Sequence, residues 1–272
     1  KNKMSNHIRN ILMADFESEG AVKAFLAKVK GAEHDFSFQA YTPMPRTLLI
    51  PEPCNDEFIY AVVKDYGLKL DQYPENIKKA VKQCFWPFKG KKDVTYGDLY
   101  SAYGRAEKRR VHLPDETEDS KPCDSKENVL GEDYFIRIKA DFDAVGAYAL
   151  QNVRRYGHPG WYSWRLANWG CKWDAWDVRI ESISSKKLRI DFTTANSTPT
   201  QALMALSKLF PTVLFDNQYA DEDIGYNCGW AKYLNGEVTE EDTPLGGDDS
   251  IDFACDVWGY DPEEYRQEQE ED

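Results

Sequence analysis

The sequence predicts an α+β protein in which two amphipathic helices cover one face of a mixed or antiparallel sheet, interrupted by a mostly helical insertion. Three observations lead to this prediction. The 272 residues are 42% hydrophobic and 14% aromatic, which is ample for a core. Short β-like segments and amphipathic helical segments alternate in both outer parts of the chain. Between them, residues 51–159 are typical of short helices and one polar loop.

The first predicted elements are a strand, a helix and a second strand. Residues 7–14 are largely apolar and typical of a strand. Ser18 is a suitable N-cap for a helix whose apolar residues recur at helical spacing up to residue 29. Residues 35–41 alternate phenylalanine with polar residues, which predicts a strand. That strand should end at Pro43 and Pro45, since proline cannot continue a ladder.

The insertion is expected to be helical with one long loop. Residues 55–67 and 74–85 each have the pattern of a short helix. Residues 94–110 are helix-like but weakened by two glycines, and residues 115–128 form the best loop candidate. The longest helix signal covers residues 132–155.

The second half of the chain returns to strands. Residues 175–184 and 187–195 flank a short polar turn and predict a hairpin. A capping box at residues 198–201, with proline at the first helical position, predicts the start of a helix. Residues 212–220 predict another strand, onto which residues 225–234 could pair back. This order predicts a ferredoxin-like fold with extra elements, a term that describes topology and implies no iron–sulfur cluster.

The charge of the chain is concentrated at one end. We expect a body of residues 1–50 and 160–239, the insertion at 51–159, and an acidic C-terminal region at 240–272. The formal net charge is −13, and the C-terminal region holds 14 acids and one base. The remaining 33 acids and 33 bases balance. Such a block repels nucleic acid and is common in interaction tails, although a solvated tail that only aids solubility is the alternative.

No local motif predicts catalysis or a bound cofactor. The six cysteines are at least 27 residues apart, and no histidine has a neighbour at metal-ligand spacing. Phosphate-binding loops, the dinucleotide fingerprint and common hydrolase motifs are absent. We therefore expect a non-enzyme without cofactor or metal. A Cys-His pair assembled from distant segments and a metal-dependent nuclease are the remaining catalytic alternatives.

One pair of carboxylates needs separate consideration. Asp174 and Asp177 lie three residues apart and could together hold magnesium. The favoured interpretation is that Asp174 caps a turn or pairs with Lys172 or Arg165.

Residues 161–177 hold five of the eight tryptophans of the chain. They could form an exposed stacking surface or a buried core. Because the segment lies where the insertion returns to the sheet, we expect most of these rings to be buried in that seam. Trp161 and Trp164 are the two expected to face a partner.

Part of this segment resembles a known family. Asn168-Trp169-Gly170 followed by Lys172-Trp173-Asp174-Ala175 resembles the signature of YubB-type proteins, encoded by plasmids and phages and described as having a ferredoxin-like domain. Shorter matches occur at residues 42–45, 197–199, 206–211 and 219–222. The chain departs from the family at its start, where Asn6 is followed by His7 and Ile8 rather than by an Asn-Trp-Cys-type stretch. The resemblance implies little about activity, but it implies a genetic setting near genes that blunt host defences.

We therefore expect a non-enzymatic phage- or plasmid-encoded interaction protein. It would inhibit a bacterial defence system, of the anti-restriction or anti-CRISPR type, by binding a host defence protein or nucleoprotein with an acidic surface that mimics nucleic acid. The residues expected to bind the partner are Trp161, Trp164, Arg165, Asp248, Asp249, Asp252, Asp256, Trp258, Asp261, Glu263 and Glu264.

The alternative is a single-stranded nucleic-acid-binding protein that uses an aromatic sheet face, as RNA-recognition modules do. The neutral body and acidic end make direct nucleic-acid binding the less expected outcome. No apolar run approaches the roughly 18 residues of a membrane helix, and the N-terminus lacks the apolar stretch of a secretion signal. We expect no membrane partner and a location in the cytoplasm of the bacterial host.

Overall fold

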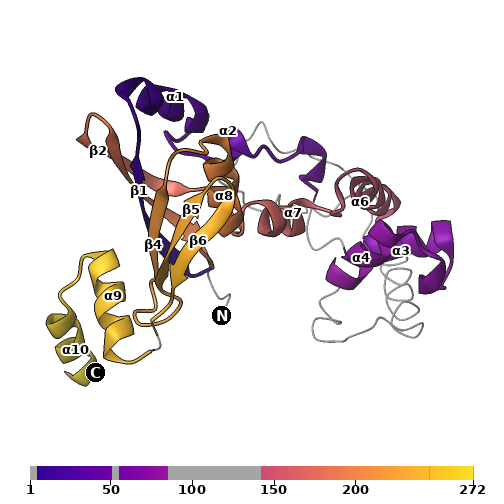
Figure 1. The fold of residues 1–272 in the computed structure, drawn as a ribbon. Coiled ribbons are helices and arrows are strands. Elements are labelled where there is room, and N and C mark those ends of the chain that lie inside the picture. The colour runs from indigo at the N-terminus through magenta and orange to yellow at the C-terminus, as the bar shows by residue number, and fades with distance from the viewer. Residues whose placement is uncertain (1–4, 51–54, 85–141, 245, 272) are drawn as a thin grey trace, which may run out of the picture. The chain divides into compact units, whose positions relative to one another are not determined.

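The computed structural model describes residues 5–50, 55–84, 142–244 and 246–271 (Figure 1). The chain divides into two compact units, Lys1–Pro43 with Arg165–Asp272, and Met44–Trp164. We call them the sheet unit and the helical unit. The insertion was predicted at residues 51–159, and the helical unit covers these residues and a few more on each side. The helix expected at 94–110 and the loop expected at 115–128 lie outside the described residues.

The sheet unit is built on six strands that all pair antiparallel. Strand β1 lies centrally, with Leu12 opposite Ile190 on one side and Asn217 on the other. The strands, in their order across the sheet, are β2 (Trp176–Ser184), β3 (Lys187–Ala195), β1 (His7–Asp15), β4 (Phe215–Asp221), β5 (Gly229–Leu234) and β6 (Glu237–Asp242). The α+β prediction with an antiparallel sheet is confirmed.

Strand β6 was not predicted, because four of its six residues are acidic and such residues are rare in strands. It forms because Asn235 and Gly236 both adopt positive φ, 50° and 87°, between β5 and β6. That combination makes the tight turn that matches the twist of a hairpin. The Asn-Gly pair was therefore a usable signal.

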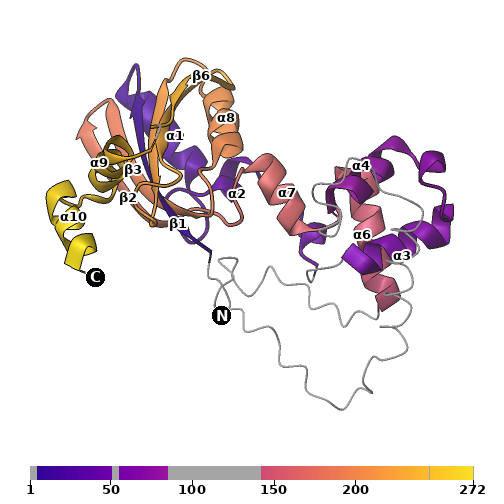
Figure 2. The ribbon, with the colours of Figure 1, turned by 90° about the horizontal axis from the view of Figure 1, so that it is seen from below.

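One face of the sheet is covered by α1 (Glu19–Val29) and α8 (Thr200–Leu209) (Figure 2). Ser18 caps α1 as predicted, because its hydroxyl accepts the Ala21 N–H at 3.1 Å. Phe25 of α1 is fully buried and contacts the rings of Phe210 and Phe215. The two predicted helices thus bury an aromatic core against this face.

The prediction of a strand at residues 35–41 is wrong. The segment instead contains the short helix α2 (Phe38–Tyr41). Alternation would have placed only one side of the segment inward, but Phe36, Phe38 and Tyr41 are all buried. Phe36 and Phe38 both contact Phe192 of β3, so the turn of a helix packs more aromatic surface here than an extended strand would.

The opposite face of the sheet is covered in part by α9 (Asp248–Trp258), which is followed by α10 (Pro262–Glu271) (Figure 2). Ile11 and Ala220 project from the sheet into a second core. Ala254, Cys255 and Val257 of α9 meet them there, each no more than 2% exposed. Gly259 ends α9 with φ of 80°, the conformation that favours glycine. The acidic C-terminal region is therefore folded onto the sheet.

The helical unit has its own core. It contains the short turns η1 (Arg46–Leu48) and η2 (Leu70–Gln72) and the helices α3 (Asn55–Tyr66), α4 (Glu75–Cys84) and α6 (Phe142–Tyr156). Phe58, Ile77 and Val153 are among its buried residues. A side chain at Gly146 would clash with the Glu57 carbonyl oxygen, so α3 and α6 approach each other closely at this glycine. Helix α7 (Trp161–Asn168) spans the boundary between the units. None of the described helices is long and apolar enough to cross a membrane.

Candidate partner-binding surface

Helix α9 divides its residues between two faces. Ala254, Cys255 and Val257 are buried, whereas the four aspartates of the helix are exposed: Asp248, Asp249, Asp252 and Asp256. Eleven helical residues span about 16 Å, so these carboxylates give about one charge per 4 Å. One strand of duplex DNA carries a phosphate about every 3.4 Å. The carboxylates of α9 are therefore spaced nearly as closely as the phosphates of a nucleic-acid strand.

The start of α10 extends this acidic surface. Asp261, Glu263 and Glu264 are all exposed, and the Asp261 carboxylate accepts the backbone N–H of Glu263 at 2.8 Å and of Glu264 at 3.1 Å. Asp261 is thus the N-cap of α10. We define the acidic surface as the exposed carboxylates Asp248, Asp249, Asp252, Asp256, Asp261, Glu263 and Glu264.

One base lies within this surface. Arg266 of α10 forms an ion pair with Asp252 and lies 3.6 Å from Asp248, so it links the two helices. The carboxylate hydrogen bond raises the pKa of Arg266. For Asp249, Asp256, Glu263 and Glu264 the described residues include no ion pair, so most of the surface charge is not neutralised.

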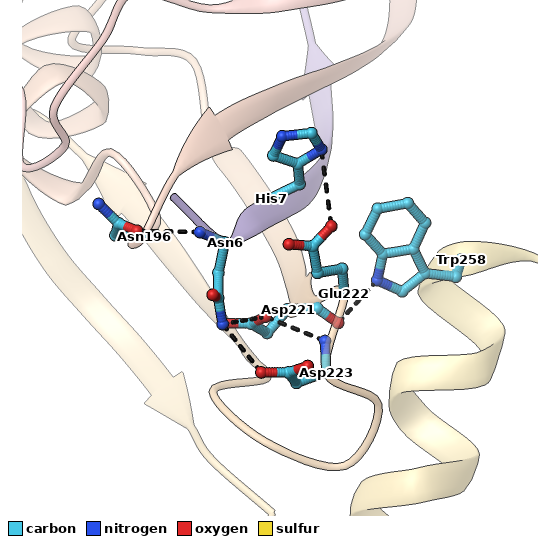
Figure 3. Close-up of polar contacts among 7 residues, drawn as sticks. All are labelled: Asn6, His7, Asn196, Asp221, Glu222, Asp223 and Trp258. Carbon is cyan, nitrogen blue, oxygen red and sulfur yellow. Dashed lines mark hydrogen bonds and ion pairs between the residues drawn. The ribbon is translucent and has the colours of Figure 1, made fainter. Parts of the chain in front are cut away.

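The C-terminal end of α9 is anchored to the sheet by Trp258 (Figure 3). The Trp258 indole N–H donates to the Asp221 carbonyl oxygen at 2.9 Å. In the other direction, Arg9 of β1 donates to the Trp258 carbonyl oxygen at 2.9 Å. The Trp258 ring is half-buried and stacks on Tyr260, which is 51% exposed. Trp258 therefore fixes the position of the acidic helix.

The loop below this anchor is held by the buried carboxylate of Asp221. It accepts hydrogen bonds from the Asn6 side chain at 3.1 Å and the Asp223 N–H at 3.0 Å (Figure 3). It also accepts one from the Asn227 side chain at 3.3 Å. His7 lies beside it, 3.6 Å from Glu222. Within the described residues, no three His, Cys, Asp or Glu side chains are arranged to hold a metal. Asp221 therefore acts as a hydrogen-bond acceptor for the loop.

The Asn-Trp-Gly motif of the tryptophan-rich segment serves folding. Trp169 is fully buried, and its indole N–H donates to the Thr42 carbonyl oxygen at 2.9 Å. Its own carbonyl accepts the Ala202 N–H in the first turn of α8 at 3.1 Å. Gly170 has φ of 88°, and a side chain there would clash with Gln201. The motif therefore holds the backbone of Trp169 and Gly170 against the start of α8.

This arrangement corrects the predicted capping box. Thr198 does not cap α8, and no side chain caps its N-terminus. The Thr198 hydroxyl instead donates to Asn10 Oδ1 at 2.9 Å, within a buried polar cluster on β1. The Trp169 carbonyl, which is distant in sequence, satisfies one of the free N–H groups of the helix.

Asp174 is also structural. It is buried and accepts hydrogen bonds from the Ser37 hydroxyl and the Phe38 N–H, both at 2.6 Å, and from the Ala175 N–H at 2.8 Å. It therefore caps α2, as the favoured interpretation of this residue held. Asp177 is exposed, with φ of 50°, in an irregular part of β2.

The structure contradicts the expectation that Trp164 and Arg165 face a partner. Trp164 is 8% and Arg165 4% exposed, because both lie on the buried side of α7, while Tyr162 and Leu166 lie on its exposed side. The Arg165 guanidinium lies 4.9 Å from the centre of the Trp169 ring. Trp161 is half-buried and belongs to the helical unit, whereas the acidic residues belong to the sheet unit.

The sequence reasoning also missed residues that organise the surface. Arg9, Asn6 and Asp221 come from segments more than 200 residues apart in the chain, so no local pattern links them. The one available signal was Arg9 itself, a cation within an otherwise largely apolar strand.

Comparisons with known proteins bear on the sheet unit. Residues 175–271 match the family model described as the ferredoxin-like domain in Api92-like protein. The match includes both acidic helices. Among solved structures, the crystal structure of a protein api92 from Yersinia pseudotuberculosis is similar, with 10% identity over 90% of this chain and 99% of that chain, and a TM-score of 0.39. No curated protein matches the chain significantly. Residues 175–271 of the chain are therefore similar to the ferredoxin-like domain found in Api92-like protein.

Proposed function

We propose that this chain is a non-enzymatic protein-binding module whose acidic surface occupies a basic, nucleic-acid-binding groove on a partner. The observation that supports this most directly is the docking of α9. Its apolar face is buried against the sheet, which holds a row of carboxylates outward on a fixed scaffold. Fixed charges need little ordering on binding, so less affinity is lost than with a flexible acidic tail.

The partner class follows from the charge of the surface. A compact row of carboxylates attracts a groove lined with lysine and arginine, and this attraction speeds association and weakens with salt. The YubB-type resemblance, which comes from residues 168–175, adds a phage or plasmid origin to the proposal. We accordingly propose that the partner is a nucleic-acid-binding component of a bacterial defence system, of the anti-restriction or anti-CRISPR type.

A second candidate is direct binding of single-stranded nucleic acid to the sheet face that α9 covers, in the part that α9 leaves open. The observation that favours it is a run of rings: His7 contacts Trp176 edge-to-face at 5.5 Å, and Trp176 contacts Trp173 at 5.8 Å. Lys172 lies 4.4 Å from the centre of the Trp173 ring. Such rings can stack on bases.

The charges of that face weaken the second candidate. Arg9 and Arg189 both contact Asp191, at 3.4 Å and 2.7 Å, so two of the cations of this face already have a carboxylate partner. Helix α9 also covers part of β1 and β4, where an RNA-recognition module keeps its sheet open. We therefore rank protein binding first.

The test is a competition experiment with the full chain. The immobilised protein is incubated with nuclease-treated bacterial lysate, and bound proteins are then challenged with DNA duplex or single-stranded DNA. We expect at least one captured nucleic-acid-binding protein that the added DNA displaces. The triple variant D249N/D256N/E264Q should bind it roughly ten- to a hundredfold more weakly, at about 0.5–1 kcal/mol for each lost charge pair.

The matched control is E17Q/E33Q/D71N, which removes three exposed carboxylates elsewhere. Equal weakening by both variants would show a non-specific charge effect and would overturn the proposal. The proposal would also be overturned if competing DNA did not displace the captured proteins. A filter-binding salt titration separates the second candidate, because tight binding of single-stranded DNA at low salt, lost steeply as salt rises, would favour it instead.

A further inference from the structure

Strand β2 forms one edge of the sheet, and no strand of the described residues pairs with its outer side. Its side chains are half-buried or exposed along its whole length, and Ile183 is 49% exposed. An edge strand leaves backbone N–H and C=O groups that another strand can pair with. At the other edge, β6 carries a single sign of charge, with exposed carboxylates at Glu237, Glu240, Glu241 and Asp242.

The regular part of β2 carries alternating charges. Register irregularities on either side leave residues 179–182 in unbroken pairing with β3. There, Arg179 lies opposite Asp191 and Glu181 lies opposite Arg189. On the other face, Ile180 lies opposite Ile190. On one side of the sheet, β2 and β3 therefore pair opposite charges, and on the other side they pair two isoleucines.

We propose that two copies of this chain pair through β2, antiparallel, with Ile180 at the twofold axis. In this register Arg179 lies opposite the partner's Glu181, and symmetry forms the same pair a second time. Each row of charges then continues across four strands. It runs from Asp191 and Arg179 to the partner's Glu181 and the partner's Arg189, with alternating sign throughout. The two Ile180 side chains meet on the opposite face.

Neighbouring registers are disfavoured by the same residues. A slip of two residues places Arg179 opposite the partner's Arg179, or Glu181 opposite the partner's Glu181, and directly opposed like charges destabilise a strand pair. A slip of one residue moves Ile180 to the charged face of the partner's strand. The charge pattern thus specifies both the partner, a second copy, and the register.

Sedimentation equilibrium of the full chain tests the proposal. About five residues per chain would pair, which gives a small interface of the weak class, below about 1,200 Å². We therefore expect reversible dimers between about 1 μM and 1 mM. The variants R179E and E181R each place like charges opposite each other twice, so each alone should be monomeric over this range. An equimolar mixture of the two should again form dimers, because positions 179 and 181 then carry opposite charges in every pair across the interface.

Further variants protect the test against misfolding. R179E/E181R swaps the two charges within one chain and should dimerise. Gln218→Glu, an exposed change of charge on the internal strand β4, is the control and should leave dimerisation unchanged. A wild type that stays monomeric up to the highest concentration would overturn the proposal. So would single variants that dimerise like the wild type, or a mixture that stays monomeric.

Discussion

Replacing Asp174 should destabilise the sheet unit strongly. The change to alanine leaves three buried donors without their acceptor: the Ser37 hydroxyl, the Phe38 N–H and the Ala175 N–H. Each unsatisfied buried donor costs about 1–3 kcal/mol, and loss of the buried charge offsets part of that sum. We expect the free energy of unfolding to fall by about 3 kcal/mol. Asp174→Asn should cost about 1 kcal/mol, because one oxygen remains for Phe38 and Ala175.

Urea unfolding followed by tryptophan fluorescence measures this effect, since Trp169 lies in the same core as α2. With a slope of about 2 kcal/mol per M, a loss of 3 kcal/mol moves the midpoint by about 1.5 M. Asp35→Ala is the control, because Asp35 is exposed nearby and forms only a surface ion pair with Lys30 at 3.2 Å. If Asp174→Ala and Asp35→Ala have the same midpoint, then Asp174 is not the cap that supports α2.

The pH dependence of the same residue has a definite sign. Burial raises the pKa of Asp174 above its ordinary value, although its hydrogen bonds oppose the shift. The ionised form therefore costs stability at neutral pH, and this cost is relieved as the pH falls through the folded-state pKa towards about 3.9. Asp174→Asn lacks this titration. The stability of the wild type relative to Asp174→Asn should rise from pH 7 to about pH 4, and a constant or falling difference would contradict the shift.

Three further predictions concern the remaining contacts. Gly170→Ala should cost about 2–4 kcal/mol, because φ is 88° and the added methyl group would lie only 3.0 Å from the Thr200 backbone nitrogen and would also displace the Gln201 side chain. Gly259→Ala, with φ of 80° and open space, should cost only about 1 kcal/mol, and chemical denaturation compares the two variants. Trp258→Phe removes the bond to the Asp221 carbonyl and should speed amide exchange in α9 but not in α8. Iodoacetamide should not label three buried thiols in the native protein: Cys171, Cys228 and Cys255. Burial raises the pKa of each of these thiols, so little reactive thiolate is present, and peptide mass spectrometry measures the labelling.

The elements that could be predicted are those whose own residues specify them. The spacing of apolar residues after Ser18 and the alternation in residues 187–195 depend on one packed face each, so periodicity alone identified α1 and β3. The segment at 35–41 could not be predicted in this way. Its helix depends on Asp174, some 136 residues away, which supplies the acceptor for the Phe38 N–H.

The candidate surface shows the same limit. The block of acids was visible from composition, and the structure places each of the seven named carboxylates at the surface. Their rigid placement was not visible, because it depends on Arg9 and Asp221 meeting Trp258 across the fold. For Trp164 and Arg165, the helical period of α7 decides burial, and the concentration of tryptophans in the segment obscured it.

The docking of α9 determines how this protein can be dissected. Ala254, Cys255 and Val257 complete the covering of Ile11 and Ala220, so a chain that stops before α9 would expose an apolar strip on its own sheet. Such a fragment would tend to aggregate, and its inactivity would be uninformative about charge. The outward carboxylates, in contrast, have no part in that interior. Their charges can be exchanged one at a time, or inverted as a set, on an otherwise unchanged scaffold.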